Sequence, residues 1–560
     1  KETFDIYEYD YNIKGNLTKV YVDGVNTLSY NYDEDYNLTS EVYANGQSIR
    51  YRYDDNNNLV SQYHNNDTSA YVTFSYNTDN ELTQKVNADT GLKYVYGENN
   101  SVEVYRLSDD TLVQSYTEDV TEANEENGIE SKTDVTESHF GDTYSYTTKN
   151  NSISYQYGDN SLTYSAKSND KSQTVSDSVK LNGTTASESK YSYDENGNVL
   201  TKSYGKSTSI ANTYDSKNRI TSTAYAGKTT NYTYDVNSQL TAVSGDNYSA
   251  SYAYNSRGNI TNKNVNGTST TFTYSNSDWK DELTVVNGTP LTYDENGNVL
   301  TYGDKSFIWN TGRNLASIVD GDNEYSYTYD ENGIRTSKTV NGITTSYNTK
   351  DGVILYQTDG TDTLYFQYDT SGVPLGFIWN GTQYFYITNQ MGDVISITDV
   401  QGNELAQYSY DEWGNTLSTS DNDIANINPL RYRGYYYDNE TSYYYLQSRY
   451  YDPCICRFIN ADDTEIAKTW KNDKFSNNLY LYCNNDPINY SDYTGYYSAR
   501  NAQTYADKWW SGHNPNYKSN ENNGGDCANF VSQCLYAGGL SKMTGSFGSS
   551  KGWHHLKRLG

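Results

Sequence analysis

The sequence predicts a mainly β protein, built from tandem β-hairpins and followed by a small C-terminal α(+β) domain. Three observations predict it. A tyrosine-containing phrase recurs at steps of 19 to 23 residues, which is typical of repeat architectures. Aromatic and polar residues alternate around each copy, as in strands with one buried face. Only six of the 560 residues are proline, so long stretches can pair as sheet.

The repeat is clearest as YSYDENGN at 191–198, LTYDENGN at 291–298 and YTYDENG at 327–333. In each copy the aspartate can accept hydrogen bonds from backbone N–H groups just ahead of it, and the glycine can adopt a positive φ. Each unit is therefore predicted to be two antiparallel strands joined by a tight turn. The motif residues of two copies are Tyr193, Asp194, Gly197, Tyr293, Asp294 and Gly297.

Stacked hairpins explain the composition. A lone hairpin is marginal in water, so neighbouring units must bury their tyrosine rows against each other. The chain has 64 tyrosines and few aliphatic residues, and each ring can bury about 150–250 Å² while its hydroxyl stays hydrogen-bonded. The repeated phrase is thus interpreted as a structural element.

The acidic turn has an alternative interpretation as a calcium loop. The stretch 194–198 carries oxygen ligands, but it lacks alternating D-x-D-x-D spacing and a terminal glutamate, so the turn is favoured. No metal site and no cofactor are predicted. An odd number of irregularly spaced cysteines gives no disulfide framework, and no histidine cluster suggests zinc. The cysteines are Cys454, Cys456, Cys483, Cys527 and Cys534.

The charge balance limits the partners. A formal net charge of −30 repels phosphate backbones and anionic lipid, so neither nucleic acid nor a membrane is expected as the partner. No run approaches the roughly 18 apolar residues of a spanning helix. A secreted or cell-surface location is expected. Because the sequence begins at Lys1, it is expected to start inside a longer chain that carries the export signal.

The units resemble YD repeats of the Rhs type, with the pattern Y-x-Y-D-x-x-G-N followed by a hydrophobic pair. The resemblance covers about 1–105 and 190–420 and implies that the hairpins spiral into a hollow β-shell over residues 1–428. Residues 106–190 carry a weaker pattern and are either drifted repeats or an insertion; drifted strands are favoured.

Residues 429–496 no longer follow the repeat pattern. The stretch PLRYRGYYYDNETSYYYLQSRYYDPCICRFINADD at 429–463 is similar to the Rhs-repeat-associated core, and NLYLYCNNDPINYSDYTGY at 478–496 continues it. The resemblance implies a plug that caps the shell ahead of a variable C-terminal cargo. Two positions depart from the pattern: Cys456 stands where glycine is expected, and Tyr493 where proline is expected.

In several members of that family the core is an aspartyl autoprotease. The resemblance places Asp462 and Asp492 at the two carboxylate positions, with Arg457 nearby as a supporting residue, and implies a cut just after Tyr496. Two carboxylates that share a proton can activate water. The alternative is that both aspartates only cap turns in the plug.

After Tyr496 the spacing becomes helical. The words ARNAQTYADKWW at 499–510 and GGDCANFVSQCLYAGG at 524–539 resemble the amidase domain family of bacterial exported proteins, related to papain-like cysteine amidases. Cys527 follows a glycine turn at the predicted start of a helix, where the helix dipole favours a thiolate, and the resemblance makes it the nucleophile. Cys534 is interpreted as core packing.

The base of such an enzyme is harder to find. Only His554 and His555 follow Cys527, and neither matches the position of the family's histidine. The amidase domain is therefore expected to be truncated over 497–560 and inactive in this chain.

Two functions are compatible with the sequence. The first is an exported Rhs-type toxin-delivery protein whose shell encloses its own C-terminal cargo, here the start of an amidase directed at peptidoglycan, with an immunity protein as a further partner. The alternative is a cell-surface or wall-associated structural protein or glycan-binding adhesin without catalytic activity. A core followed by a change of fold favours the first.

Overall fold

The computed structural model describes residues 7–98, 100–121, 132–149, 151–171, 173–204, 208–350, 352–462 and 478–495. In these residues, forty strands form one sheet and four more form a second sheet. Each strand of the large sheet pairs antiparallel with the next strand along the chain. The mainly β fold predicted from the sequence is confirmed, whereas the predicted α(+β) domain lies outside the described residues.

The strands of the large sheet follow the chain from its beginning. Its first part contains β1 Tyr7–Tyr11, β2 Leu17–Val22, β3 Val25–Tyr32, β4 Leu38–Tyr43, β5 Ser48–Tyr53, β6 Leu59–His64, β7 Val72–Tyr76, β8 Leu82–Asn87, β9 Leu92–Tyr96 and β10 Val102–Arg106. The next part contains β11 Leu112–Thr121, β12 Lys132–His139, β13 Asp142–Lys149, β14 Ser152–Tyr157, β15 Asn160–Ser168, β16 Thr174–Leu181 and β17 Thr184–Tyr193. The weakly patterned region 106–190 thus contributes β11 to β17 to the same sheet.

The sheet then continues without a break in its meander. It contains β18 Val199–Tyr204, β19 Thr208–Tyr214, β20 Ile220–Tyr225, β21 Lys228–Tyr234, β22 Leu240–Gly245, β23 Tyr248–Tyr254, β24 Ile260–Val265, β25 Thr268–Thr273, β26 Val285–Val286, β27 Thr289–Tyr293, β28 Val299–Tyr302 and β29 Lys305–Trp309. It ends with β30 Leu315–Asp320, β31 Asn323–Tyr329, β32 Arg335–Val340, β33 Ile343–Lys350, β34 Val353–Thr358, β35 Thr363–Tyr368, β36 Pro374–Trp379, β37 Thr382–Thr388, β38 Val394–Thr398, β39 Glu404–Tyr410 and β40 Thr416–Thr419.

A short connection leads from the large sheet to the small one. It contains helix α1 Asp423–Ile427 and the 3₁₀ turn η2 Tyr432–Gly434. The small sheet contains β41 Tyr436–Asp438, β42 Tyr443–Leu446, β43 Arg449–Asp452 and β44 Arg457–Phe458, and the 3₁₀ turn η4 Cys483–Asn485 follows. No helix in the described part of the chain has both the length and the apolar character needed to cross a membrane.

The hairpin turn has the geometry that its residues predict. Asp194 accepts hydrogen bonds from the backbone N–H and the side-chain amide of Asn198, both at 2.8 Å, and Gly197 has a φ of +91°. These hydrogen bonds, together with one from the Asn196 backbone, hold the pKa of Asp194 below its ordinary value. Asp294 accepts the same pair of bonds from Asn298, at 2.9 Å each. The motif aspartate therefore closes the turn from within.

The motif tyrosine joins one hairpin to the one before it. Its hydroxyl donates to the backbone carbonyl of a residue at or near the start of an earlier strand: Tyr193 to Thr174 at 2.6 Å, and Tyr254 to Leu240 at 2.5 Å. Tyr293 donates to the carbonyl of Leu283 at 3.1 Å. The same bond recurs in the pairs Tyr32–Leu17, Tyr53–Leu38, Tyr76–Leu59, Tyr214–Val199, Tyr234–Ile220, Tyr329–Leu315 and Tyr410–Val394.

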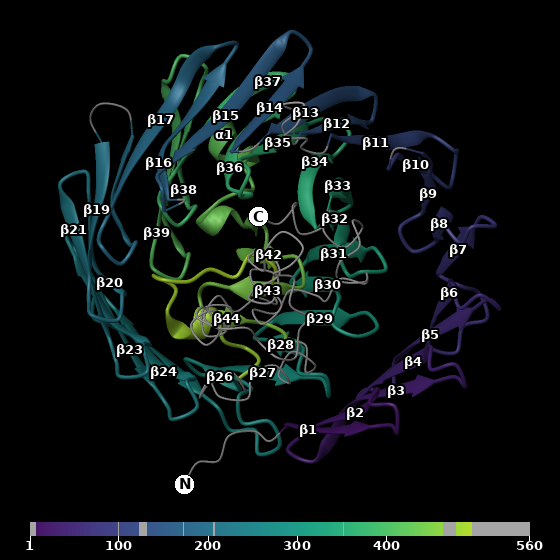
Figure 1. Ribbon diagram of the computed structural model, residues 1–560. Coiled ribbons are helices and arrows are strands. Elements are labelled where there is room, and N and C mark those ends of the chain that lie inside the picture. The colour runs from purple at the N-terminus through teal and green to yellow at the C-terminus, as the bar shows by residue number, and fades with distance from the viewer. Residues whose placement is uncertain are drawn as a thin grey trace.

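The large sheet is wound into a spiral. Figure 1 shows β1 to β24 as an outer ring that begins at the lower right, passes over the top and descends on the left, while β27 to β34 run up again inside the right-hand side. Hydrogen bonds join the two turns: Lys85 to Glu331 at 2.5 Å, Tyr155 to the Tyr368 carbonyl at 2.9 Å, and Lys202 to the Thr388 carbonyl at 3.1 Å. We call this line of contacts the seam.

Candidate functional site

The core, residues 429–462 and 478–495, contacts strands and turns from around the spiral. Figure 1 shows its strands β42, β43 and β44 within the ring. Its hydrogen bonds reach the wall at widely spaced points. They join Ile220 to Asn489 (2.9 Å), Asn259 to Asn478 (2.7 Å), Gly297 to Tyr480 (3.0 Å), Arg335 to Asp438 (2.7 Å), Asp393 to Arg433 (2.8 Å) and Trp413 to Tyr451 (2.8 Å). The core is therefore a plug fastened to about one turn of wall.

A buried ion cluster is one of these fastenings. The Asp438 carboxylate binds Arg335 at 2.7 Å and Lys338 at 2.9 Å, and Lys338 also binds Glu440. Burial alone would raise the pKa of Asp438, but the two cations hold it below its ordinary value. Rings of wall and core surround the guanidinium of Arg335, at 4.3 to 5.9 Å: Tyr327, Tyr347, Tyr436, Tyr445 and Tyr450.

Two buried carboxyl groups of the core and wall lack such a cation bond. Burial raises the pKa of Glu412, which accepts a hydrogen bond from the Tyr248 hydroxyl at 2.9 Å, to about 7. Burial likewise raises the pKa of Asp452 to about 6. Both groups are therefore held in a protonated form at a higher pH than free carboxyl groups.

The two aspartates singled out in the sequence lie at one guanidinium. Nη2 of Arg449 is 3.0 Å from Oδ2 of Asp462 and 3.3 Å from Oδ2 of Asp492, and all three residues are at most 4% exposed. Strand β43 supplies the arginine, while the aspartates come from segments on either side of the undescribed stretch 463–477. A shared cation offsets the repulsion between two buried carboxylates.

The end of the described core lies at the same place. Nε of Arg449 donates to the carbonyl of Gly495, and the hydroxyl of Ser448 donates to the carbonyl of Thr494 at 2.8 Å. The chain therefore leaves the described core beside the two carboxylates. Water activation by such a pair is the chemistry that this arrangement can support.

The other residues singled out in the sequence lie elsewhere. Arg457 donates to the backbone carbonyl of Asp281 at 2.6 Å and stacks on the rings of Tyr274 and Tyr480. Cys456, at the expected glycine position, has a φ of +60° and is buried. Cys527 and the predicted cut after Tyr496 lie outside the described residues.

The sequence does not mark Arg449 as the partner of the two aspartates. Arg449 is part of the R-Y-Y-D-P stretch at 449–453, which carried the resemblance to the core family, but nothing local marks it as the partner of two distant aspartates. Only the fold of β42 and β43 brings it there.

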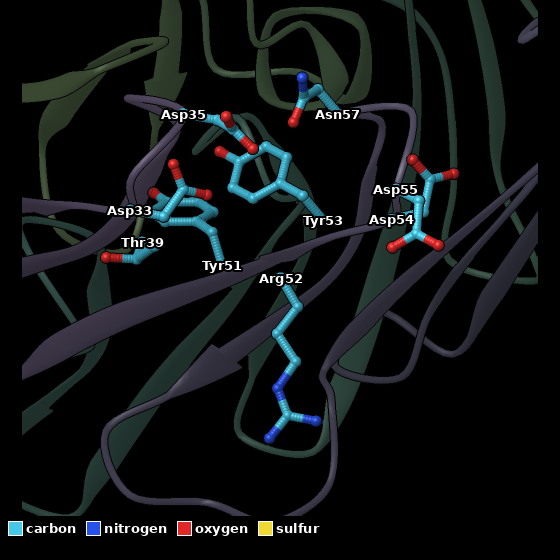
Figure 2. Close-up of a pocket in the computed structure, with 9 residues that line it drawn as sticks. All are labelled: Asp33, Asp35, Thr39, Tyr51, Arg52, Tyr53, Asp54, Asp55 and Asn57. Atoms are coloured by element: carbon cyan, nitrogen blue, oxygen red, sulfur yellow. The ribbon is translucent and has the colours of Figure 1, made fainter.

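A pocket of about 450 Å³ lies on the first turn of the spiral, over β4 and β5 (Figure 2). Figure 2 shows Tyr51 and Tyr53 on one side of their strand and Arg52 on the opposite side. Hydrogen bonds from Asn58 hold the pKa of Asp54, at its edge, below the ordinary value. The lining residues are Asp33, Asp35, Thr39, Tyr51, Arg52, Tyr53, Asp54, Asp55 and Asn57.

Three protein families match the chain. Residues 223–488 match the teneurin YD-shell family, residues 32–70 match the RHS repeat family, and residues 496–558 match a family described as "Putative amidase domain". The first match runs from β20, late in the outer ring, through the second turn of the spiral and most of the core.

Similar curated proteins include the tRNA3(Ser)-specific nuclease WapA of Bacillus spizizenii, 39% identical over 224 residues, and the tRNA nuclease WapA of Bacillus subtilis, 37% identical over 224 residues. Each match covers 39% of this chain but only 9% of the relative. The chain thus spans less than a tenth of the length of these relatives.

Solved structures show the same fold. The crystal structure of TcdB2-TccC3-Cdc42 has a TM-score of 0.68 at 15% identity, over 88% of this chain and 30% of that chain. The Photorhabdus luminescens Tc holotoxin pore has a TM-score of 0.66 at 15% identity, over 88% and 29%. The chain is an RHS/YD-repeat protein with a teneurin-like YD shell, followed by a segment that matches the amidase domain family.

Proposed function

We propose that this chain is the shell and plug of an exported toxin-delivery protein, which encloses the segment that follows Gly495 and cuts it from the core. The observation that carries the proposal is the path of the chain. It leaves the described core at Gly495, whose carbonyl is bound by Arg449 beside Asp462 and Asp492. The plug around this point is fastened to wall segments from Ile220 to Trp413.

The cargo in this proposal is a cysteine amidase. Residues 496–558 match the family described as "Putative amidase domain". In this proposal Cys527 is the nucleophile, which attacks an amide carbonyl to form an acyl-enzyme. Peptidoglycan stem peptides are the substrate class, and an immunity protein is a further partner. The WapA relatives support a toxin role, although their names specify tRNA nucleases and their match covers only 9% of their length.

Limited proteolysis of the folded protein tests enclosure. A protease-resistant fragment that retains residues 497–560 is expected, together with rapid loss of these residues once the shell is opened by denaturant. Rapid loss of residues 497–560 from the intact shell would contradict enclosure.

Intact mass tests self-cleavage. A fragment that ends near Tyr496 is expected in the wild type and should be absent from Asp492→Asn. Wild-type protein that stays uncut would reject self-cleavage without affecting the enclosure result. For the amidase, a thiol-directed probe should label Cys527 faster than Cys534, and equal rates would count against Cys527 as nucleophile.

The second candidate is a surface adhesin that binds glycans. The pocket over β4 and β5 favours it, because tyrosine rings such as Tyr53 offer a stacking face and the aspartates offer hydrogen-bond acceptors for sugar hydroxyls (Figure 2). Glycan-array binding that is lost in Tyr53→Ala, with residues 497–560 exposed to protease, would favour this function over delivery.

A further inference from the structure

A lysine of the wall meets two carboxylates of the plug at one point. Nζ of Lys338, on β32, lies 2.9 Å from Oδ1 of Asp438, at the end of β41. The same Nζ lies 2.8 Å from Oε1 and 3.1 Å from Oε2 of Glu440. Nη1 of Arg335, also on β32, donates to Oδ2 of Asp438 at 2.7 Å. The two oxygens of Asp438 are therefore held by different cations, and Lys338 lies between two carboxylates.

The turn after β41 fixes the two carboxylates relative to each other. The backbone N–H groups of Thr441 and Ser442 donate to the carbonyl of Asp438, at 3.2 and 2.8 Å. Ser442 has a φ of +63°, so the chain reverses directly behind Glu440 and enters β42 at Tyr443. Both carboxylates thus belong to one tight turn of the plug, whereas the lysine and the arginine come from one strand of the wall.

This cluster is largely closed off from water. The side chain of Asp438 is 0% exposed, that of Lys338 11% and that of Glu440 13%. The ring of Tyr436 has its centre 5.6 Å from Nζ of Lys338, and the hydroxyl of Tyr347 donates to the Tyr436 hydroxyl at 3.1 Å. Burial disfavours the charged forms of both partners, so an ammonium and a carboxylate in contact can become a neutral amine and a neutral acid at a lower cost than in water.

We propose that Lys338 and Asp438 become joined by an isopeptide bond, an amide between the two side chains, which the folded protein forms by itself with Glu440 as the proton carrier. A buried lysine that loses its proton is a nucleophile, and the fold already holds it against the carboxyl group that it attacks. The bond closes a loop of 100 residues and attaches the plug to the wall covalently. It is independent of the delivery function proposed above.

The bond forms with the loss of one water molecule. Glu440 first carries a proton from the Lys338 ammonium to Oδ1 of Asp438, so that a neutral amine faces a neutral carboxyl group. Burial raises the pKa of Glu440, which suits it to take up this proton and return it. The lone pair of Nζ then adds to Cγ of Asp438, and negative charge develops on Oδ2, to which Arg335 already donates.

The intermediate then collapses to the amide. Glu440 carries a second proton from Nζ to Oδ1, the Cγ–Oδ1 bond breaks, and Oδ1 leaves as water. One ammonium and one carboxylate have become one amide and one water, and Glu440 ends as it began. Arg335 keeps its hydrogen bond to Oδ2, which is now the amide oxygen.

A tryptic digest of the denatured full chain tests the bond, because an amide survives denaturation and an ion pair does not. Trypsin cuts after a free lysine but not after one whose Nζ is in an amide. The wild type is therefore expected to give one branched product, residues 336–350 joined to residues 434–449, lighter than the two separate peptides by one water. A cut near Tyr496 lies outside both peptides and does not affect this result.

Lys85 is the matched control within the same digest. Its Nζ binds Oε1 of Glu331 at 2.5 Å, and the pair is about as buried as the one at Lys338. The other oxygen of Glu331, however, accepts from the amide of Asn87 instead of a guanidinium. Trypsin should therefore cut after Lys85 as it does after an exposed lysine.

Two variants assign the roles. Glu440→Gln keeps the size of the side chain but removes the proton carrier, and Lys338→Arg keeps the positive charge but removes the nucleophile. Both are expected to lose the branched product, to elute with the wild type on size-exclusion chromatography, and to melt at a lower temperature, since the unfolded chain is no longer cross-linked. Separate peptides in the wild type, with trypsin cutting after Lys338, would overturn the bond. A branched product that persists in Glu440→Gln would overturn the role of Glu440, and one that persists in Lys338→Arg would overturn the assignment of the lysine.

Discussion

Arg335 of β32 and Asp438 of β41 form an ion pair, 2.7 Å long, between the wall of the shell and its plug. Both side chains are fully buried. A change that removes one partner of this pair should therefore weaken the attachment of the plug to the wall.

Replacing Arg335 with methionine should destabilise the protein by about 3–5 kcal/mol, because it leaves the Asp438 carboxylate buried with only Lys338 as a cation. Denaturant unfolding followed by tyrosine fluorescence measures this. Arg106→Met is the control: its ion pair with Asp109 is about half exposed, so the cost should stay below about 1 kcal/mol. Equal effects of the two changes would contradict a special role for the buried pair.

Removing one tyrosine hydroxyl from the ladder should cost about 0.5–1.5 kcal/mol. In Tyr254→Phe the ring stays, but the carbonyl of Leu240 loses the hydrogen bond that the Tyr254 hydroxyl donates to it at 2.5 Å. Thermal unfolding compares it with Tyr21→Phe, whose hydroxyl makes an exposed contact with Asp10. The prediction is wrong if the exposed and buried hydroxyls contribute equally.

The shell should become less stable as the pH rises from about 4.5 to about 7. Burial raises the pKa of Glu412 to about 7, so the folded state binds this proton more tightly than the unfolded state, and folding is favoured while the proton is bound. Above pH 7 the ionised group costs about 3 kcal/mol relative to low pH. Burial also raises the pKa of Glu282 to about 7, which adds to the same slope.

Glu412→Gln should remove part of that slope, since glutamine keeps an acceptor for Tyr248 but carries no charge. Denaturant midpoints at pH 5 and pH 8 measure it: the variant should match the wild type at pH 5 and exceed it at pH 8. The exposed Glu195→Gln is the control and should keep the wild-type slope. An unchanged slope in Glu412→Gln would argue against a buried, protonated Glu412.

The motif glycine should matter more where the plug covers the turn. Gly402 and Gly297 both have a positive φ, +82° and +79°, but a Cβ at Gly402 meets nothing within 4 Å, whereas one at Gly297 lies 2.5 Å from the Tyr480 hydroxyl and 2.9 Å from Trp279. Gly402→Ala should cost only the backbone strain, about 1–2 kcal/mol. Gly297→Ala should cost about 1–3 kcal/mol more from overpacking. Calorimetric melting of the two variants checks the difference.

The hairpins were predictable from the sequence because their chemistry is local. Asp194, Gly197 and Asn198 lie within five residues, and their turn depends on nothing else. The seam could not be predicted in this way. Lys85 and Glu331 are 246 residues apart, and no period in the sequence states how many hairpins complete one turn.

The candidate site likewise has a part that the sequence predicts and a part that only the fold reveals. The pattern of the core family points to Asp462 and Asp492, and it has Arg457 nearby as a supporting residue. The structure places Arg449 against both carboxylates, since the tight turn between β42 and β43 directs it there. A cation that meets its partners through a fold of this kind has no signature in the linear sequence.

The seam has a consequence for how such a chain can change in length. The sequence separation between seam partners falls from 252 residues, for Ala44 and Asn296, to 186, for Lys202 and Thr388. One turn of the spiral therefore contains fewer residues when it starts later in the chain. Inserting a single repeat between two such partners would shift the later strands by one hairpin relative to the strands that they face across the seam. A gain or loss of a single repeat between seam partners should therefore be disfavoured, because it would break contacts such as those of Asp23 with Lys280 and of Lys85 with Glu331.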